Sequence, residues 1–245
     1  EEIHALVVFL KGQTKEKVPE RYIMSFIKPA QGTIDEGRRM VQRLNCQGCH
    51  LLEGEGRLIE PSLRDPGQAP PILDGIGARV RPEWMFHFLQ DPSGTRIRPW
   101  IDIRMPTFGF SDADTHTLTK YFSGLSNVKS DAYSTVPAPV LSGETKMAAE
   151  KLVSGDVFSC FSCHIRGAVT PASPPQQWGP DLTLVRQRIR PEFLPEWIKD
   201  PQRFTPGVNM PAFLPSDDAA PPDILGGDRQ KQAEALRDYL LNLSK

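Results

Sequence analysis

The chain has 245 residues, enough for two domains of the usual size, and its formal net charge of −1 argues against nucleic acid as a partner. Hydrophobic residues make up 39% and charged residues 24%, so the chain has the apolar material for packed cores and is not of the disordered class. Its 24 prolines exceed the average share of about 5% and predict an all-α fold of short helices separated by extended connections.

Three segments of the chain resemble one another and have the apolar spacing of an amphipathic helix with one buried face. They are residues 3–12, 115–124 and 233–242, and the Leu and aromatic positions coincide in all three: Leu6, Leu118, Leu236, Phe9, Tyr121 and Tyr239. Each is interpreted as the closing helix of a module. Because the first copy precedes any complete module, we expect residues 1–31 to be the closing helix of an upstream module plus a linker, and the chain to be a fragment of a longer one.

Two shorter blocks also repeat, with the same offset at every matched position. They are Arg81-Pro82-Glu83-Trp84 with Asp91-Pro92, and Arg190-Pro191-Glu192-Phe193 with Asp200-Pro201. We therefore expect two tandem modules, the first at residues 32–128 and the second, preceded by a proline-rich linker, at 129–245. The longest apolar run, residues 5–10, is far shorter than the roughly 20 residues that cross a bilayer.

All four cysteines lie in two identical frames, Cys46-Gln47-Gly48-Cys49-His50 and Cys160-Phe161-Ser162-Cys163-His164. C-x-x-C-H is the attachment signature of c-type haem, because two thiols on one helical turn add to the two vinyl groups and the adjacent imidazole points at the iron. Apolar residues within 34–44 and 147–152 predict a helix before each frame. The sequence thus predicts two covalently attached haems.

Cysteine and histidine in this spacing can also form two other kinds of site. A zinc site requires four ligands, of which each frame supplies three, and two frames so far apart in the chain make poor zinc knuckles. A redox C-x-x-C pair is the other alternative, and two copies each followed directly by His fit it badly.

The sixth iron ligand decides between electron transfer and ligand chemistry. Two of the six methionines occupy matched contexts, Met105-Pro106-Thr107-Phe108 and Met210-Pro211-Ala212-Phe213. A thioether is neutral and soft, favours ferrous iron and raises the potential, so these two are the candidate ligands. The methionines without a matched partner are interpreted as core residues: Met24, Met40, Met85 and Met147.

His87 is a rival iron ligand in the first module because it lies on a predicted apolar helix. Its repeat counterpart is Glu196, which cannot serve the same purpose, so we interpret His87 as a packing or surface residue. His4 and His116, on the closing helices, are expected on the solvent side.

A backbone carbonyl can hold each axial imidazole through its other ring nitrogen. The candidates are Pro71 and Pro180, which lie at the same repeat offset, although a rigid loop turn explains them equally well. Arginines suited to haem carboxylates are dense, and Arg81 and Arg190 stand out because their neighbours recur. The other arginines of this set are Arg79, Arg98, Arg104, Arg186, Arg188 and Arg203.

With these features the sequence resembles the class I cytochrome c family, in which a helix runs into C-x-x-C-H and a proline-leucine loop, a distal Met-Pro and a final helix follow. The resemblance covers nearly all of residues 32–245, twice over. It implies thioether bonds and iron ligands at Cys46, Cys49, Cys160, Cys163, His50, His164, Met105 and Met210. The sequence departs from the pattern in the long stretch from His50 to Pro71 and in an insertion at 217–227.

The function that follows is electron transfer by a non-enzymatic carrier whose two irons are six-coordinate. Electrons would enter at one haem, pass to the second and leave to a redox partner through a small transient interface. Haem attachment of this type places the protein in the periplasm or another extracytoplasmic compartment. By analogy, the upstream part could join it to a membrane oxidoreductase complex. The alternatives are a dihaem peroxidase and a gas sensor with one labile iron ligand.

Overall fold

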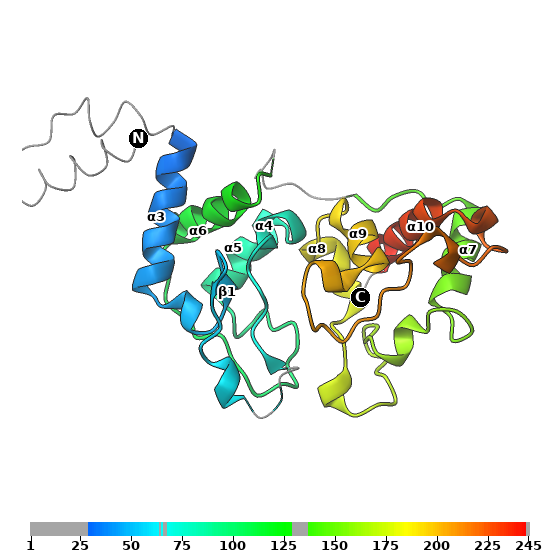
Figure 1. Ribbon diagram of the computed structural model, residues 1–245, viewed down its shortest axis with the longest axis horizontal. Helices are drawn as coiled ribbons and strands as arrows, with labels where there is room; N and C mark the ends of the chain where they lie inside the picture. Colours follow the sequence, from blue (N-terminus) through cyan, green and yellow to red (C-terminus); the bar gives the residue numbers. More distant parts are fainter. Residues whose placement is uncertain (1–28, 64, 66–67, 129–136, 244–245) are drawn as a thin grey trace, which may run out of the picture.

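The computed structural model describes residues 29–63, 65, 68–128 and 137–243 (Figure 1). The closing helix expected at 3–12, with His4 and Met24, lies outside these residues, as does much of the linker before the second frame. Within the described residues, no helix has both the length and the apolar character needed to cross a bilayer.

The described residues form α-helices and 3-10 helices with very little strand, which confirms the predicted helical class. The first helix group comprises α3 (Pro29–Arg43), α4 (Ile76–Arg79), α5 (Pro82–Gln90) and α6 (Asp112–Leu125). The second helix group comprises α7 (Gly143–Val153), α8 (Val185–Arg188), α9 (Phe193–Lys199) and α10 (Arg229–Asn242).

The remaining elements are short. Strands β1 (Leu51–Leu52) and β2 (Glu55–Gly56) pair antiparallel, with Leu51 opposite Gly56. The 3-10 helices are η1 (Cys46–Gly48), η2 (Glu60–Ser62), η4 (Cys160–Ser162), η5 (Pro175–Gln177), η6 (Leu182–Leu184), η7 (Pro201–Arg203), η8 (Asp217–Ala219) and η9 (Leu225–Gly227).

The helices expected from the sequence are present. α3 and α7 precede the two cysteine frames, and α6 and α10 contain the two described closing segments; α3 begins ahead of residue 32, at Pro29. α6 begins after a capping box, in which Ser111 Oγ accepts from the Asp114 N–H and the Asp114 carboxylate accepts from the Ser111 N–H. α10 begins after Asp228, whose carboxylate accepts from two N–H groups of the first turn.

In each group the helix before the frame packs against the closing helix: α3 contacts α6, and α7 contacts α10. The first crossing is close because Gly37 has no side chain: a Cβ there would lie 2.3 Å from Tyr121 Cβ. The ring of Tyr121 fills this space and is completely buried. Gly37 therefore sets the distance between α3 and α6.

Two of the methionines interpreted as core residues are buried. Met40 and Met85 lie in the main hydrophobic cluster, as predicted. Met147 does not: its side chain is 66% exposed, and the core interpretation is wrong for it. α7 turns Ala149, Leu152 and Val153 inward, and Met147 lies on the other side of this stripe.

The two helix groups lie side by side, with α5 in contact with α8 (Figure 1). Val80 and Ile189, which occupy equivalent repeat positions, form an antiparallel bridge. The Arg81 N–H donates to Arg188 O at 2.8 Å, and the Arg190 N–H donates to Arg79 O at 2.9 Å. Because equivalent residues pair with each other, the contact between the groups is approximately twofold symmetric.

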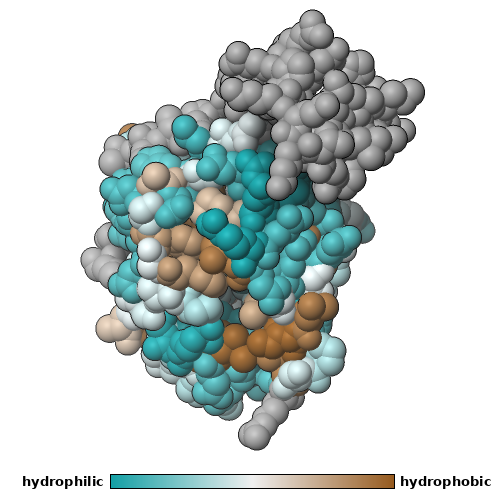
Figure 2. Space-filling view, turned by 90° about the vertical axis from the view of Figure 1, so that its left-hand side faces the viewer, coloured by the Kyte–Doolittle hydropathy of each residue, from teal (hydrophilic) through white to brown (hydrophobic). Residues whose placement is uncertain are grey.

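Figure 2 views the molecule from the side of the first helix group. This face is mostly hydrophilic and carries two separate apolar areas, which is ordinary for a globular surface.

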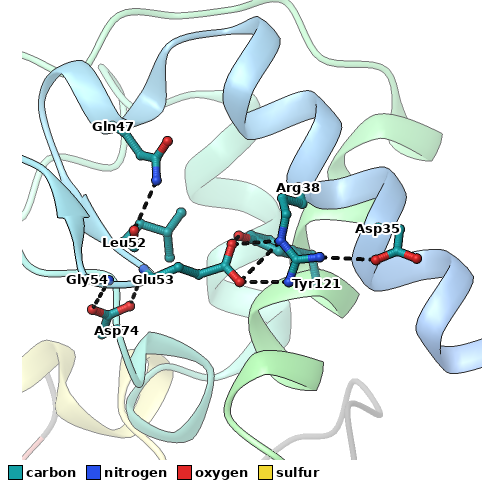
Figure 3. A network of polar contacts seen from close by, with 8 residues as sticks. All are labelled: Asp35, Arg38, Gln47, Leu52, Glu53, Gly54, Asp74 and Tyr121. Atoms are coloured by element: carbon teal, nitrogen blue, oxygen red, sulfur yellow. Dashed lines mark hydrogen bonds and ion pairs between the residues drawn. The ribbon is translucent and has the colours of Figure 1, made fainter. Parts of the chain in front are cut away.

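A polar network joins α3, the β1–β2 turn and α6 (Figure 3). Arg38 donates to both carboxylate oxygens of Glu53, at distances between 2.7 and 3.2 Å, and the Tyr121 hydroxyl donates to Glu53 at 3.0 Å. The turn residues Glu53 and Gly54 both have positive φ, and Asp74 accepts from their N–H groups. The hydrogen bonds from Arg38 hold the pKa of Glu53 below its usual value.

We predict that Gly37→Val destabilises the fold, because the added atoms overlap the Tyr121 ring. The free energy of unfolding should fall by about 1–3 kcal/mol, measured by urea denaturation. Gly143→Ala is the matched control, since a Cβ at Gly143 meets no atom within 4 Å. Equal stability of Gly37→Val and the wild type would contradict the proposed close crossing.

We predict that the contribution of Glu53 to stability depends on pH. Its pKa is lowered in the folded state, so its contribution is present above the unfolded pKa and is lost as the pH falls through the folded value. Glu53→Gln should lower the free energy of unfolding by about 0.5–1 kcal/mol at pH 7, a value limited by solvent screening. The difference from the wild type should shrink at acidic pH, and a difference independent of pH would refute the linkage.

Candidate functional site

The two cysteine frames have the same backbone conformation. Each begins after a residue in the left-handed region, Asn45 at φ 52° and Ser159 at φ 53°, and continues into a 3-10 helix, η1 or η4. The N–H of the frame histidine then donates to the carbonyl of the first cysteine, at 2.9 Å for His50 and 3.0 Å for His164. Each frame therefore holds two thiols and one imidazole on a single tight turn.

A proline carbonyl orients each imidazole. Nδ1 of His50 lies 2.8 Å from Pro71 O, and Nδ1 of His164 lies 2.8 Å from Pro180 O. A carbonyl only accepts, so Nδ1 carries the proton and Nε2 keeps its lone pair. Burial lowers the pKa of both histidines against the opposing effect of the carbonyls, which favours neutral imidazole. This is the protonation state that a metal ligand needs.

The second imidazole is also packed from one side. Gly179 donates its N–H to Cys163 O at 2.7 Å, and a Cβ at Gly179 would lie 2.6 Å from the Nδ1 and Cε1 atoms of His164. A side chain at position 179 would therefore overlap the His164 ring as it lies in this structure.

The thiols of the two frames form no disulfide. All four cysteines are unpaired. Burial raises the pKa of Cys46, and it raises that of Cys160 to about 11. A redox C-x-x-C pair needs the opposite, a thiol whose pKa is lowered. Among the residues that the structure describes, no three His, Cys, Asp or Glu side chains form a group that could hold a metal ion, so the ligand set of the zinc alternative is not found there.

The two candidate methionines have different surroundings. Met105 is partly buried and packs against the main hydrophobic cluster. Met210 is also partly buried, and its Sδ accepts a hydrogen bond from Trp197 Nε1 at 3.1 Å. The rival His87 is exposed on α5, and His116 is exposed on α6.

The arginines singled out from the sequence bind the opposite helix group. Arg81 donates from Nη1 to Arg186 O at 3.0 Å, and Arg190 donates from Nε to Gly77 O at 2.8 Å. Each of these bonds runs from a side chain of one group to a backbone carbonyl of the other.

Arg79 and Arg188 were not singled out from the sequence, although they also occupy equivalent repeat positions. The Arg79 guanidinium lies over the Trp197 ring at 5.6 Å from its centroid, and the Arg188 guanidinium lies over Trp84 at 5.3 Å. Both Nε atoms are buried and have no hydrogen-bond partner in the protein. Burial lowers the pKa of Arg79 to about 10 and that of Arg188 to about 9, where the charge of Arg79 adds to the effect. Both guanidinium groups are therefore positive at neutral pH.

Residues 34–126 match the family model for cytochrome c. The comparisons find no significant match among curated proteins or solved structures. The family match supports a cytochrome c relationship, with covalent haem c, iron binding and haem-based electron transfer. The matched residues contain the first cysteine frame, Met105 and α6, and they end before the second frame.

Proposed function

We propose that the chain carries two c-type haems, one in each helix group, and transfers electrons between redox proteins without catalysing a reaction of its own. The repeated turn, with its imidazole oriented by a proline carbonyl, carries this proposal. Each haem would supply a one-electron ferrous–ferric couple. Residues 32–128 and 129–245 are then two tandem cytochrome c modules.

The residues of each frame have distinct roles in this proposal. The thiols of Cys46, Cys49, Cys160 and Cys163 form the thioether bonds. His50 and His164 present Nε2 to the iron, while Pro71 O and Pro180 O hold the other ring nitrogen and fix the ring orientation. Met105 and Met210 would each supply a thioether sulfur to the iron. Two protein ligands leave no open coordination position, as suits a carrier.

Arg79 and Arg188 fit the carboxylates of the two haems. Each guanidinium has a buried Nε atom without a hydrogen-bond partner, and the two positive charges repel each other, as the lowered pKa of Arg188 indicates. An anionic group at the contact between the helix groups offsets both effects, and haem carries two carboxylates on one edge. We therefore assign the carboxylate contacts to Arg79 and Arg188, and a bridging role between the groups to Arg81 and Arg190.

Cytochromes of this type are usually extracytoplasmic, and we place this protein in the periplasm or an equivalent compartment. Its donor and acceptor would be redox proteins that dock transiently.

The test is a redox titration of the holoprotein followed by optical spectroscopy, together with the protein mass. We expect two haems per chain, two one-electron transitions and a thioether-to-iron band in the ferric spectrum. Replacing Cys160 and Cys163 by Ala should leave one haem. A single haem in the wild type would overturn the proposal, and rapid, complete binding of carbon monoxide or turnover of peroxide would favour a sensor or a peroxidase.

We also predict that Gly179→Ala impairs the second haem site alone. The new methyl group overlaps the His164 ring and should move it away from Pro180 O. Iron ligation at that haem should become partly high-spin, while the first haem keeps its low-spin spectrum. Gly155→Ala is the control, because a Cβ at Gly155 meets no atom within 4 Å. Unchanged low-spin spectra at both haems of Gly179→Ala would contradict this role of Gly179.

A further inference from the structure

The two candidate iron sites differ at one residue that contacts a methionine. On α9, Trp197 donates its indole N–H to Met210 Sδ at 3.1 Å. The equivalent residue on α5, at the repeat offset of the Arg-Pro-Glu block, is Phe88, which has no polar hydrogen. Phe88 instead stacks on Trp84, with ring centroids 4.8 Å apart. Met105 therefore receives no such bond from the equivalent position.

Several contacts hold the Trp197 ring in place. Phe193 and Phe204 lie against it, with centroids at 5.8 and 6.3 Å. From the first helix group, the Arg79 guanidinium lies 5.6 Å from the ring centroid. A positive charge over the face of an indole draws electron density from the ring and makes its N–H a better donor. The bond to Met210 is therefore fixed in direction and strengthened from the other half of the molecule.

We propose that Trp197 raises the redox potential of the second haem site by its hydrogen bond to Met210, and so makes this site the electron-accepting one of the pair. The inference rests on the proposed function, with Met210 as iron ligand. A hydrogen bond to the thioether reduces the electron density that sulfur donates. Ferric iron needs this density more than ferrous iron does, so the bond favours the ferrous state.

The electron balance is simple. One electron leaves the first site, which is oxidised, and reaches the second site, which is reduced. No bond is made or broken, and Trp197 keeps its proton. Trp197 is a positioning residue, because it acts through Met210.

The test compares redox titrations of the wild type and Trp197→Phe, which gives the second group the residue of the first. In the wild type, the transition that Trp197→Phe moves should be the one at higher potential. At a fixed potential, the ratio of ferrous to ferric haem at this site should fall roughly threefold. This corresponds to a midpoint potential lower by about 28 mV, at 59 mV per tenfold change. The other transition should not move.

The control is Trp84→Phe. Trp84 also lies at the contact between the groups under an arginine, but its change leaves the bond to Met210 intact. The potential of the second site should not change in this variant. An equal downward shift in both variants would overturn the inference, because it would show a general effect of losing an indole at this contact.

The thioether-to-iron band separates the two proposals. If the wild type lacks this band at the second haem, the proposed ligation fails. If the band persists in Trp197→Phe and the potential is unchanged, the ligation stands and the role of Trp197 is refuted. If Trp197→Phe loses the band or does not fold, benzothienylalanine introduced at position 197 decides, since it keeps the ring shape without the N–H. A lowered potential in that variant supports the inference, and an unchanged one overturns it.

Discussion

The hydrogen bond between a frame imidazole and a proline carbonyl is the constraint on which the proposed sites depend. It occurs twice with the same length, 2.8 Å at His50 and at His164. The imidazole follows a cysteine turn, whereas the carbonyl comes from a loop further along the chain, so the bond joins two separate segments around one ring. Without it the ring could rotate and either nitrogen could carry the proton; with it, Nε2 is the nitrogen left for a metal.

The contact between the helix groups is also formed by residues that recur in both halves of the chain. Equivalent residues meet at a near-twofold axis, so a charged residue that is present in both copies, such as Arg79 with Arg188, appears twice at this contact. Arg79 and Arg188 illustrate the consequence, because the positive charge of Arg79 contributes to the lowered pKa of Arg188. An anionic group at this contact would reduce the repulsion between them, which links the contact to the proposed cofactor.

Much of this was predictable from the sequence. The apolar stripes before each frame and the closing segments predicted α3, α7, α6 and α10, because a helix with one buried face leaves a regular pattern. The apolar pattern of the sequence did not predict that Met147 is exposed, because an apolar residue one position away from the buried stripe points outward. The sequence pattern also ranked Arg81 above Arg79, because recurring neighbours mark a repeat without telling what each arginine side chain contacts. That distinction depends on tertiary packing, as does the bond from Trp197 to Met210.

In a protein with two repeated redox sites, electron transfer has a preferred direction only where the two repeats differ. Two equal sites would share an electron equally, whereas a difference in one hydrogen-bond donor favours one of them. Phe88 and Trp197 occupy equivalent positions on α5 and α9, but only the indole has an N–H group, which it donates to Met210 Sδ. Because Arg79 of the first half lies over Trp197 of the second, this asymmetry also depends on the contact between the halves. In the proposed dihaem protein, the potential difference between the sites would therefore depend on the pair and not on either module alone.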